Sequence, residues 1–385
     1  MSNGGMSEEA LALGVYARRG LMLVRGENEF VWDAQGRQYI DCIAGHGSAN
    51  IGHANPLVAG AIAAQATRLL ACSNIFTNDV RGAYLELLMS VAPPPLQKAF
   101  LCNSGAEAIE AALKFARRVT GREEIISTFR AFHGRTFGAL SVTHNPQYRD
   151  GFGTLLPGVV FVPYNDPAAM DAAVTDKTAA VVLEIVQGEG GVHVGTPEFL
   201  RSAARFCRER GALLIIDEVQ TGFGRTGRLF AFEHFGLEPD IVCLAKSIAG
   251  GLPMGAVLCT GRISLPSGSH GTTFGGNPVC CAAAHATLQF ILSARLAEAA
   301  AEKGTYLGGS LATIPSTRIR EIRRLGLMVG IDLREKVKPF LDRLQEAGVL
   351  ALPAGPTVLR LLPPLTIGYA GLDRVVEAIR DVFTA

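Results

Sequence analysis

The chain has 385 residues, of which 48% are apolar and 44 are glycine, and its formal net charge is +1. This length suits two domains better than one small core, and the composition excludes a disordered or fibrous protein. A nearly neutral charge balance without a basic stripe argues against nucleic acid as a partner.

Eight cysteines occur without any CxxC pair, so we expect neither a metal site nor a disulfide framework. Reduced thiols are typical of the cytoplasm. The first residues lack the basic start and apolar core of a signal peptide, and no apolar stretch approaches the roughly 20 residues that span a bilayer. We therefore expect a cytoplasmic protein without a membrane partner.

The N-terminal part predicts a few strands followed by a helix. Residues 21–42 alternate between apolar and polar types, with turn residues at 26–28 and 33–36. Residues 55–70 predict a helix that begins at an Asn-Pro pair.

The central part alternates between strands and helices. Residues 104–119 predict a helix in which Glu110 and Lys114 pair at i,i+4. Residues 197–210 predict another helix. Apolar runs without alternation favour a mostly parallel sheet that helices cover on both faces. We expect its strands at 158–164, 179–186, 212–219, 240–246 and 255–261.

The C-terminal part lacks the regular alternation of strands and helices. It predicts a smaller α+β domain that the N-terminal strands join. A helical stretch comes first, and shorter elements follow it. We expect helices at 276–300, 337–347 and 371–384, and strands at 319–334 and 357–362.

Ligands of parallel α/β sheets bind beyond the carboxyl ends of the strands. Four polar residues are expected there, namely Glu184, Asp217, Gln220 and Lys246. Asp217 follows an apolar run, so its carboxylate at the rim of a dry core needs a cation or a proton donor. Lys246 is the only lysine in the stretch 178–302. The two charges either pair directly or hold opposite ends of one small molecule.

Pyridoxal phosphate would satisfy both charges, since its aldehyde condenses with an amine and its protonated ring nitrogen needs a carboxylate. Its phosphate needs backbone donors at a helix start, which Ser104 and Gly105 would supply in "NSGAEA". A salt-bridged Lys246 and a plain N-cap at Ser104 remain the simpler alternatives.

Two segments resemble parts of nucleotide-binding motifs, but the remainder of each motif is missing. "LLIIDE" resembles a Walker B strand, but the chain has no GxxxxGK[ST] sequence. "GFGRTG" at 222–227 matches GxGxxG, yet too few residues separate it from the next strand for the helix of a dinucleotide-binding unit. We expect a tightly turning loop instead.

Seven blocks follow one another in a recognisable order across nearly the whole chain. They are "NSGAEAIEAALKFAR" (103–117), "FHGRTFGALS" (132–141), "EIVQGEGGV" (184–192), "LLIIDEVQTGFGRTG" (213–227), "LAKSIAGGLPMGA" (244–256), "HGTTFGGNP" (270–278) and "LRLLPPLTI" (359–367). Together they resemble the class III, or subgroup II, aminotransferases, which depend on pyridoxal phosphate. Members that act on acetylornithine, or on lysine or ornithine linked to a carrier protein, are the most similar.

The resemblance implies the α/β architecture called fold type I of the pyridoxal-phosphate-dependent transferases. A large domain, 50–290, would surround a mostly parallel seven-stranded sheet. Residues 1–49 and 291–385 would form the smaller α+β domain. A homodimer with active sites shared between subunits is also implied.

The resemblance further implies which residues bind pyridoxal 5'-phosphate. Lys246 would bind the aldehyde covalently and later carry a proton, so it and Asp217 would be the catalytic residues. Asp217 would pair with the pyridinium nitrogen, and Gln220 would reach the ring hydroxyl. The other cofactor contacts would be Phe132 on the ring, Ser104, Gly105 and Ala106 beside the phosphate, and Thr273 reaching the phosphate from the partner chain.

The implied substrate contacts are mainly arginines. Arg135 would grip the α-carboxylate with its planar fork, which lysine cannot replace. Arg360 would pair with Glu189 until 2-oxoglutarate displaces that carboxylate, and Thr272 would lie near the substrate. A purely structural Arg360–Glu189 salt bridge is the alternative.

The expected activity is transfer of the terminal amine of N-acetylornithine, or of carrier-linked lysine or ornithine, to 2-oxoglutarate. The products would be a semialdehyde and glutamate, in arginine or lysine biosynthesis, with an acidic carrier protein as a possible partner. Alternatives are an ω-aminotransferase for ornithine, succinylornithine or 4-aminobutyrate, a non-transaminating enzyme of the same fold, or a binding protein. Ile185, Ala106 and Phe76 depart from the common family residues, and Phe76 leaves the amino donor open.

Overall fold

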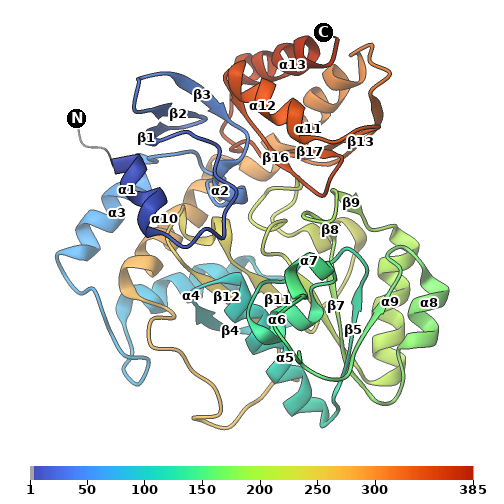
Figure 1. The fold of residues 1–385 in the computed structure, drawn as a ribbon. Helices are drawn as coiled ribbons and strands as arrows, with labels where there is room; N and C mark the ends of the chain where they lie inside the picture. Colours follow the sequence, from blue (N-terminus) through green and yellow to red (C-terminus); the bar gives the residue numbers. More distant parts are fainter. Residues whose placement is uncertain (1–3, 385) are drawn as a thin grey trace.

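A seven-stranded sheet lies at the centre of the structure, a computed structural model that describes residues 4–384 (Figure 1). Its strands, in spatial order, are β4 (Leu96–Cys102), β12 (Gly255–Thr260), β11 (Ile241–Leu244), β10 (Leu213–Asp217), β7 (Thr178–Glu184), β5 (Glu124–Thr128) and β6 (Val159–Val162). Only β12 runs antiparallel to its neighbours in this sheet. The predicted α/β class with a mostly parallel seven-stranded sheet is confirmed.

Successive residues of each strand enter two different cores, because side chains alternate between the two faces of a sheet. Leu213 and Ile215 pack with residues of the helix α5 (Gly105–Thr120). Leu214 and Ile216 belong to the larger core, which includes residues of α9 (Pro197–Arg210) and α10 (Pro278–Ser293). Burial on both faces explains why these strands are continuous apolar runs.

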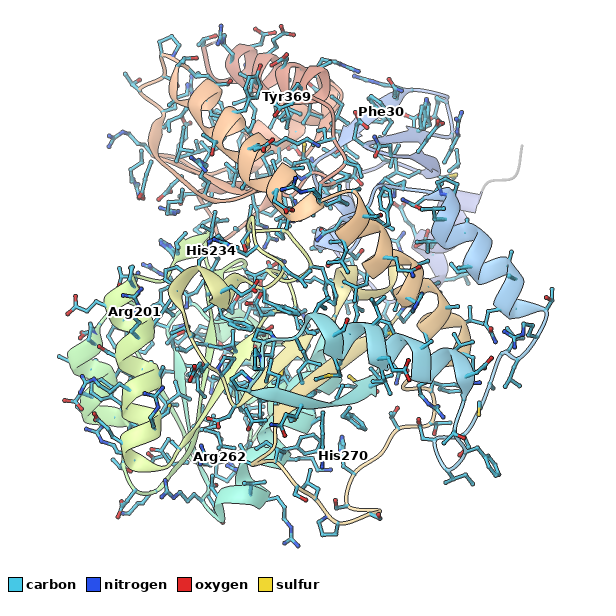
Figure 2. All side chains as sticks on the ribbon, turned by 180° about the vertical axis from the view of Figure 1, so that it is seen from behind. Phe30, Arg201, His234, Arg262, His270 and Tyr369 are labelled. Carbon is cyan, nitrogen blue, oxygen red and sulfur yellow. The ribbon has the colours of Figure 1, made fainter. Side chains whose placement is uncertain are left out.

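The helix α5 begins as the sequence predicts, but its surface pairing differs. Glu110 and Lys114 do not pair: Glu110 Oε1 accepts hydrogen bonds from the backbone N–H groups of Gly138 (2.8 Å) and Ala139 (3.2 Å). These groups lie in the first turn of α6 (Phe137–Val142), where N–H groups lack partners inside the helix. Lys114 Nζ lies 2.9 Å from His270 Nδ1, and His270 lies at the edge of the molecule opposite Tyr369 (Figure 2).

Asparagine, aspartate or threonine before proline starts several helices. Asn55 Oδ1 accepts from the N–H groups of Leu57 and Val58 at the start of α3 (Pro56–Ala66). The same arrangement, a capping side chain followed by proline, begins α8 (Pro167–Ala173), α9 and α10. Two further helices that the sequence did not delimit are α4 (Asp79–Val91) and α7 (Pro146–Arg149).

The helical stretch expected at 276–300 is two helices, α10 and α11 (Leu296–Ala312), separated at Arg295, which has φ +50°. Among the described residues, no single helix is long and apolar enough to cross a bilayer. Taken together, the pair α10 and α11 has the required length and composition, but it is bent by 61°.

The strand expected at 319–334 is a hairpin of β13 (Ile319–Leu325) and β14 (Met328–Leu333). Gly326 in its turn has φ +56°, and a Cβ there would lie 2.4 Å from the backbone of Thr226. The remaining C-terminal elements are α12 (Lys338–Glu346), β15 (Val349–Leu350), β16 (Leu352–Pro353), β17 (Val358–Leu361) and α13 (Tyr369–Thr384).

Strands from the two ends of the chain form one sheet. The N-terminal strands β1 (Leu23–Glu27), β2 (Phe30–Asp33) and β3 (Gln38–Asp41) continue through β15, which pairs in parallel with β3. In Figure 1 they lie beside α12 and α13, above the central sheet. The N-terminal helix is α1 (Gly4–Leu11). The exact division into 50–290 against 1–49 and 291–385 stays a prediction.

The "GFGRTG" segment is buried, and its Arg225 binds residues from both the N-terminal and the C-terminal part of the chain. Arg225 is fully buried, and its Nη1 donates to the carbonyl oxygens of Leu327 (3.0 Å) and Pro363 (2.6 Å). Its Nη2 donates to Asn50 Oδ1. Burial lowers the pKa of Arg225 to about 9. The short 3₁₀ helix η1 (Ala231–Phe235) follows, which agrees with a turning loop rather than a dinucleotide-binding unit.

Candidate active site

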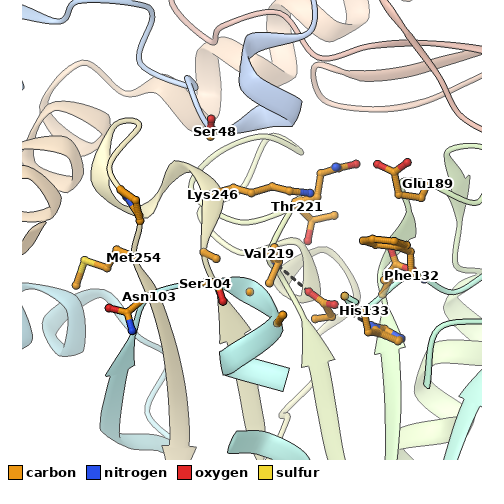
Figure 3. A pocket seen from close by; sticks show the side chains of 18 of the residues that line it. Ser48, Asn103, Ser104, Phe132, His133, Glu189, Val219, Thr221, Lys246 and Met254 are labelled. Carbon is orange, nitrogen blue, oxygen red and sulfur yellow. Dashed lines mark hydrogen bonds and ion pairs between the residues drawn. The ribbon is translucent and has the colours of Figure 1, made fainter. Parts of the chain in front are cut away.

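A cavity of about 360 Å³ opens at the carboxyl ends of β7, β10 and β11 (Figure 3). Eight residues that the sequence predicted as site residues line it: Ser104, Gly105, Ala106, Phe132, Glu189, Asp217, Gln220 and Lys246. Glu184, which the sequence placed at a strand end, lines it as well.

Lys246 is the first residue of the 3₁₀ helix η2 (Lys246–Ala249), which closely follows β11, and it lines the cavity. Its backbone has φ +49°, a left-handed conformation that costs a non-glycine residue energy and is often kept at functional sites. Burial is the main reason that its pKa is lowered, and the charge of Arg360 adds to this, although Glu189 opposes it. The Lys246 amine therefore loses its proton more easily than an exposed lysine.

Asp217 pairs with His133 instead of Lys246. His133 Nδ1 lies 2.7 Å from Asp217 Oδ2, and Asp217 Oδ1 accepts from the N–H of Val219 at 2.9 Å. Burial opposes the charged form of His133, but the hydrogen bond and charge of Asp217 outweigh burial and raise its pKa. The carboxylate is thus held in one orientation. His133 was not among the predicted site residues, although it directly follows Phe132 in one of the seven blocks.

Glu184 holds two parts of the cavity wall. Its Oε1 accepts from the N–H of Phe132 (3.0 Å) and its Oε2 accepts from the N–H of Gly188 (3.1 Å). Burial raises the pKa of Glu184 to about 7. Phe132, half-buried, meets the ring of Tyr148 edge-on at 5.5 Å.

The start of α5 forms another part of the wall. Ser104 Oγ accepts from the N–H of Glu107 at 3.1 Å, so Ser104 caps the helix, which was the simpler alternative for this residue. The N–H groups of Gly105 and Ala106 have no acceptor inside the helix and belong to residues that line the cavity. A Cβ at Gly105 would lie 2.8 Å from Val219 Cγ1, so glycine permits the close approach of these two segments.

Arg360 contacts two side chains, those of Glu189 and Gln220. Its Nη2 is 2.7 Å from Glu189 Oε1, and its Nη1 donates to Gln220 Oε1 at 3.0 Å. Gln220 Nε2 in turn donates to the carbonyl of His46 at 3.4 Å. The Arg360 side chain is 1% exposed. Although burial raises the pKa of Glu189, the charges of Arg360 and Lys246 outweigh it and lower that pKa.

Besides Arg360, which contacts the cavity wall at Glu189, three predicted site residues do not line this cavity. Arg135 is exposed, with its guanidinium 4.2 Å from the ring centre of Tyr148. Thr272 Oγ1 accepts from Asn103 Nδ2 at 3.0 Å, and Thr273 is exposed. Both threonines line a second cavity of about 960 Å³. The roles of these three residues stay predictions.

The residues around the first cavity fit pyridoxal phosphate. They provide a buried amine, a carboxylate fixed by two donors, an aromatic ring and free N–H groups at a helix start. A Cβ at Gly134 would lie 3.0 Å from that of Ala106, so the wall beside the helix start is closely packed. When bound, this cofactor supplies an aldehyde that condenses with amines and a protonated ring that withdraws electrons. Fold and site thus define an enzyme dependent on pyridoxal phosphate.

Comparison with known proteins agrees with this site. The family described as Aminotransferase class-III matches residues 15–383. A [LysW]-aminoadipate semialdehyde transaminase of Deinococcus radiodurans is 47% identical, over 98% of this chain and 89% of the relative. An acetylornithine aminotransferase of Methanosarcina mazei is 45% identical, over 95% of this chain and 92% of its own.

Solved structures give the same result. The ornithine aminotransferase of Toxoplasma gondii, described with partial occupancy of PLP at its active site, superposes with a TM-score of 0.94 at 33% identity, covering 99% of this chain and 93% of that one. The acetylornithine aminotransferase of Elizabethkingia anophelis has a TM-score of 0.88 at 31% identity, covering 99% and 98%. The chain belongs to the class III aminotransferases, and pyridoxal phosphate is its cofactor. It catalyses transamination of small-molecule substrates.

Proposed function

We propose that this enzyme transfers the terminal amine of an N-acylated ornithine or lysine to 2-oxoglutarate, in arginine or lysine biosynthesis. The acyl group is either acetyl or a carrier protein, as the names of the two relatives reported above suggest. The products are the corresponding semialdehyde and glutamate.

The observation that carries this proposal is the pair of Arg360 and Glu189 at 2.7 Å, within reach of the cavity that holds Lys246. While paired, the two charges cancel, so the pocket suits an uncharged chain end. Once a ligand carboxylate takes the place of Glu189, the same arginine binds a dicarboxylate through a planar, bidentate contact. One pocket therefore serves an acylated amine and 2-oxoglutarate in turn.

Lys246 and Asp217 take the two catalytic roles in this proposal. The lowered pKa of Lys246 supports a neutral amine that binds the cofactor and then moves a proton at the substrate carbon bearing the amine. Asp217, fixed by His133 and Val219, supports a protonated cofactor ring. Phe132 would hold that ring, and the N–H groups of Gly105 and Ala106 would donate to the phosphate. Gln220 connects the ring side to Arg360.

The remaining roles require a second copy of the chain. We infer a homodimer in which Thr273 binds the phosphate of the partner's cofactor and Thr272 lies near the substrate. Exposed apolar residues near these threonines support an interface: Ile75 is 83% exposed, and Phe76 and Phe274 are each 64% exposed. Arg135 then binds the α-carboxylate of the substrate.

A carrier-bound substrate is the second candidate, because of the name of the Deinococcus relative. Arg130 and Arg135 are exposed and lie on either side of Phe132 in the chain. An acidic carrier protein would meet positive charge at these positions. A cytoplasmic location is consistent with this function and remains part of the proposal.

The test is a substrate panel on the purified holoenzyme with 2-oxoglutarate present. We expect acetylornithine or a carrier-linked substrate to exceed ornithine and 4-aminobutyrate at least about tenfold in kcat/KM, because an acyl group removes a charge that the pocket does not match. Equal rates for free ornithine would indicate the ω-aminotransferase alternative. Turnover that is independent of 2-oxoglutarate would indicate a non-transaminating enzyme.

A further inference from the structure

The loop that carries Glu189 is held in a strained conformation. It joins β8 (Val186–Gln187) to β9 (His193–Val194), which form a two-stranded hairpin. Gly191 has φ +118° and Val192 has φ +56°, a value at which a β-branched residue is a genuine outlier. Strain of this kind persists only where neighbouring groups over-determine the backbone. The contacts of this loop therefore decide where Glu189 stands.

Two arginines of the C-terminal sheet hold the loop at different points. Arg360, in β17, binds the Glu189 side chain. Arg323, in β13, binds the backbone two residues later, since its Nε (3.1 Å) and Nη2 (2.8 Å) both donate to the carbonyl of Gly191. Only the first of these contacts is broken when a substrate carboxylate takes Arg360.

Arg323 is itself firmly placed. Its side chain is 10% exposed, and its Nη1 contacts Asp332 Oδ2 at 3.3 Å and the carboxylate of Glu321. The loop also packs directly on the sheet, because a Cβ at Gly330 would lie 2.8 Å from Val192 Cβ. The Gly191 carbonyl therefore binds a preorganised guanidinium rather than a mobile side chain.

We propose that Arg323 is a positioning residue that sets how strongly Glu189 competes with a substrate dicarboxylate for Arg360. The inference rests on the proposed function, in which the two carboxylates exchange on that arginine. By fixing the loop backbone, Arg323 keeps the Glu189 carboxylate beside Arg360 at little entropic cost. It thereby biases the pocket toward the acylated, uncharged chain end.

The direction of the effect separates this role from simple electrostatics. If Arg323 only attracted anions, its removal would weaken the binding of a dicarboxylate. If it acts through Glu189, its removal loosens the competitor and a dicarboxylate binds more tightly. Loss of the two hydrogen bonds from Arg323 loosens the loop, and only part of their energy bears on the position of Glu189, so we expect the Kd of a dicarboxylate to fall about five- to tenfold.

The experiment measures the Kd of glutarate, an unreactive dicarboxylate, by calorimetry on the holoenzyme. Arg323→Gln should lower that Kd about five- to tenfold. Glu189→Gln removes the competitor, so adding Arg323→Gln to it should change the Kd no further. Arg320→Gln is the matched control, because Arg320 lies on the same strand and pairs with the same Asp332 at 3.7 Å. Arg320 is not one of the two arginines that hold the loop, so the Kd of glutarate for this variant should match that of the wild type.

An unchanged or higher Kd in Arg323→Gln, or an equal decrease in both backgrounds, would show the inference to be wrong. Should Arg323→Gln fail to fold, Arg323→Lys keeps the charge with a poorer fit and should lower the Kd about twofold, and a wild-type value would overturn the inference. The variant Arg360→Met tests the proposed function separately from the role of Arg323. If it leaves glutarate binding intact, the carboxylate exchange of the proposed function fails and the inference fails with it.

Discussion

His133 and Asp217 are joined by a hydrogen bond of 2.7 Å between residues 84 positions apart, and the His133 side chain is fully buried. The N–H of Val219 donates to the other oxygen, Asp217 Oδ1, so both oxygens are held while each can still accept from a further donor. The imidazole therefore fixes the orientation of the carboxylate that we propose to pair with the cofactor ring.

Replacement of His133 should lower turnover without removing the fold. His133→Leu loses a charge-assisted hydrogen bond worth roughly 1.5–3 kcal/mol, which corresponds to about a 10- to 100-fold decrease in kcat/KM. His133→Asn keeps a donor near the position of Nδ1 and should lose less. Steady-state kinetics of both variants check this. Equal activity of His133→Leu and the wild type would contradict the role given to the pair.

The buried carboxyl group of Glu218 should make the stability of the protein depend on pH. Burial raises its pKa to about 7, although Thr221 Oγ1 and the N–H of Phe232 donate to it. Below pH 4.5 the carboxyl group is protonated in both states. Between about pH 4.5 and 7 the unfolded chain releases the proton first, so the free energy of unfolding falls as pH rises, by roughly 3 kcal/mol for this group.

Glu218→Gln should remove that part of the pH dependence. Denaturant unfolding at pH 5 and pH 8 measures the difference, and Glu377→Gln, at an exposed position, serves as the control. We expect the Glu218→Gln curve to be flatter than that of the control. Identical pH dependence in the two variants would mean that the Glu218 carboxyl titrates normally in the folded protein.

Gly188→Ala should impair the dicarboxylate half-reaction. A Cβ at Gly188 would lie 1.9 Å from Gln220 Oε1, so Gln220 must leave Arg360, which then loses a hydrogen bond. We expect roughly a tenfold slower single-turnover reaction with 2-oxoglutarate. Gly60→Ala, in α3 with no atom within 4 Å of the added Cβ, is the control and should react normally. A normal rate in Gly188→Ala would show that Gln220 does not orient Arg360.

The sequence revealed the buried strands β7, β10, β11 and β12, because they read as continuous apolar runs. It missed the buried strand β5, in which polar Ser127 and Thr128 shorten the apolar run. It did not delimit β4, where Gln97 and Lys98 are exposed and interrupt the pattern at the sheet edge. Nor did it predict the break between α10 and α11, since Ala294 and Arg295 are neither glycine nor proline. Edge strands and breaks of this kind depend on tertiary contacts.

The site was predictable where a residue type is rare in its surroundings and hidden where two distant segments meet. Lys246 was conspicuous as the only lysine in a long stretch. The partner of Asp217 was not, because His133 comes from another block of the chain. Glu110 shows the same limit: its expected partner was four residues away, but it binds the start of a different helix.

The most direct measurement asks which residue carries the cofactor. Reduction of the purified holoenzyme with borohydride followed by peptide mass mapping should place a phosphopyridoxyl group on Lys246, and Lys246→Ala should lose turnover. A label on another lysine, or full turnover in Lys246→Ala, would contradict the assignment of this cavity as the catalytic site.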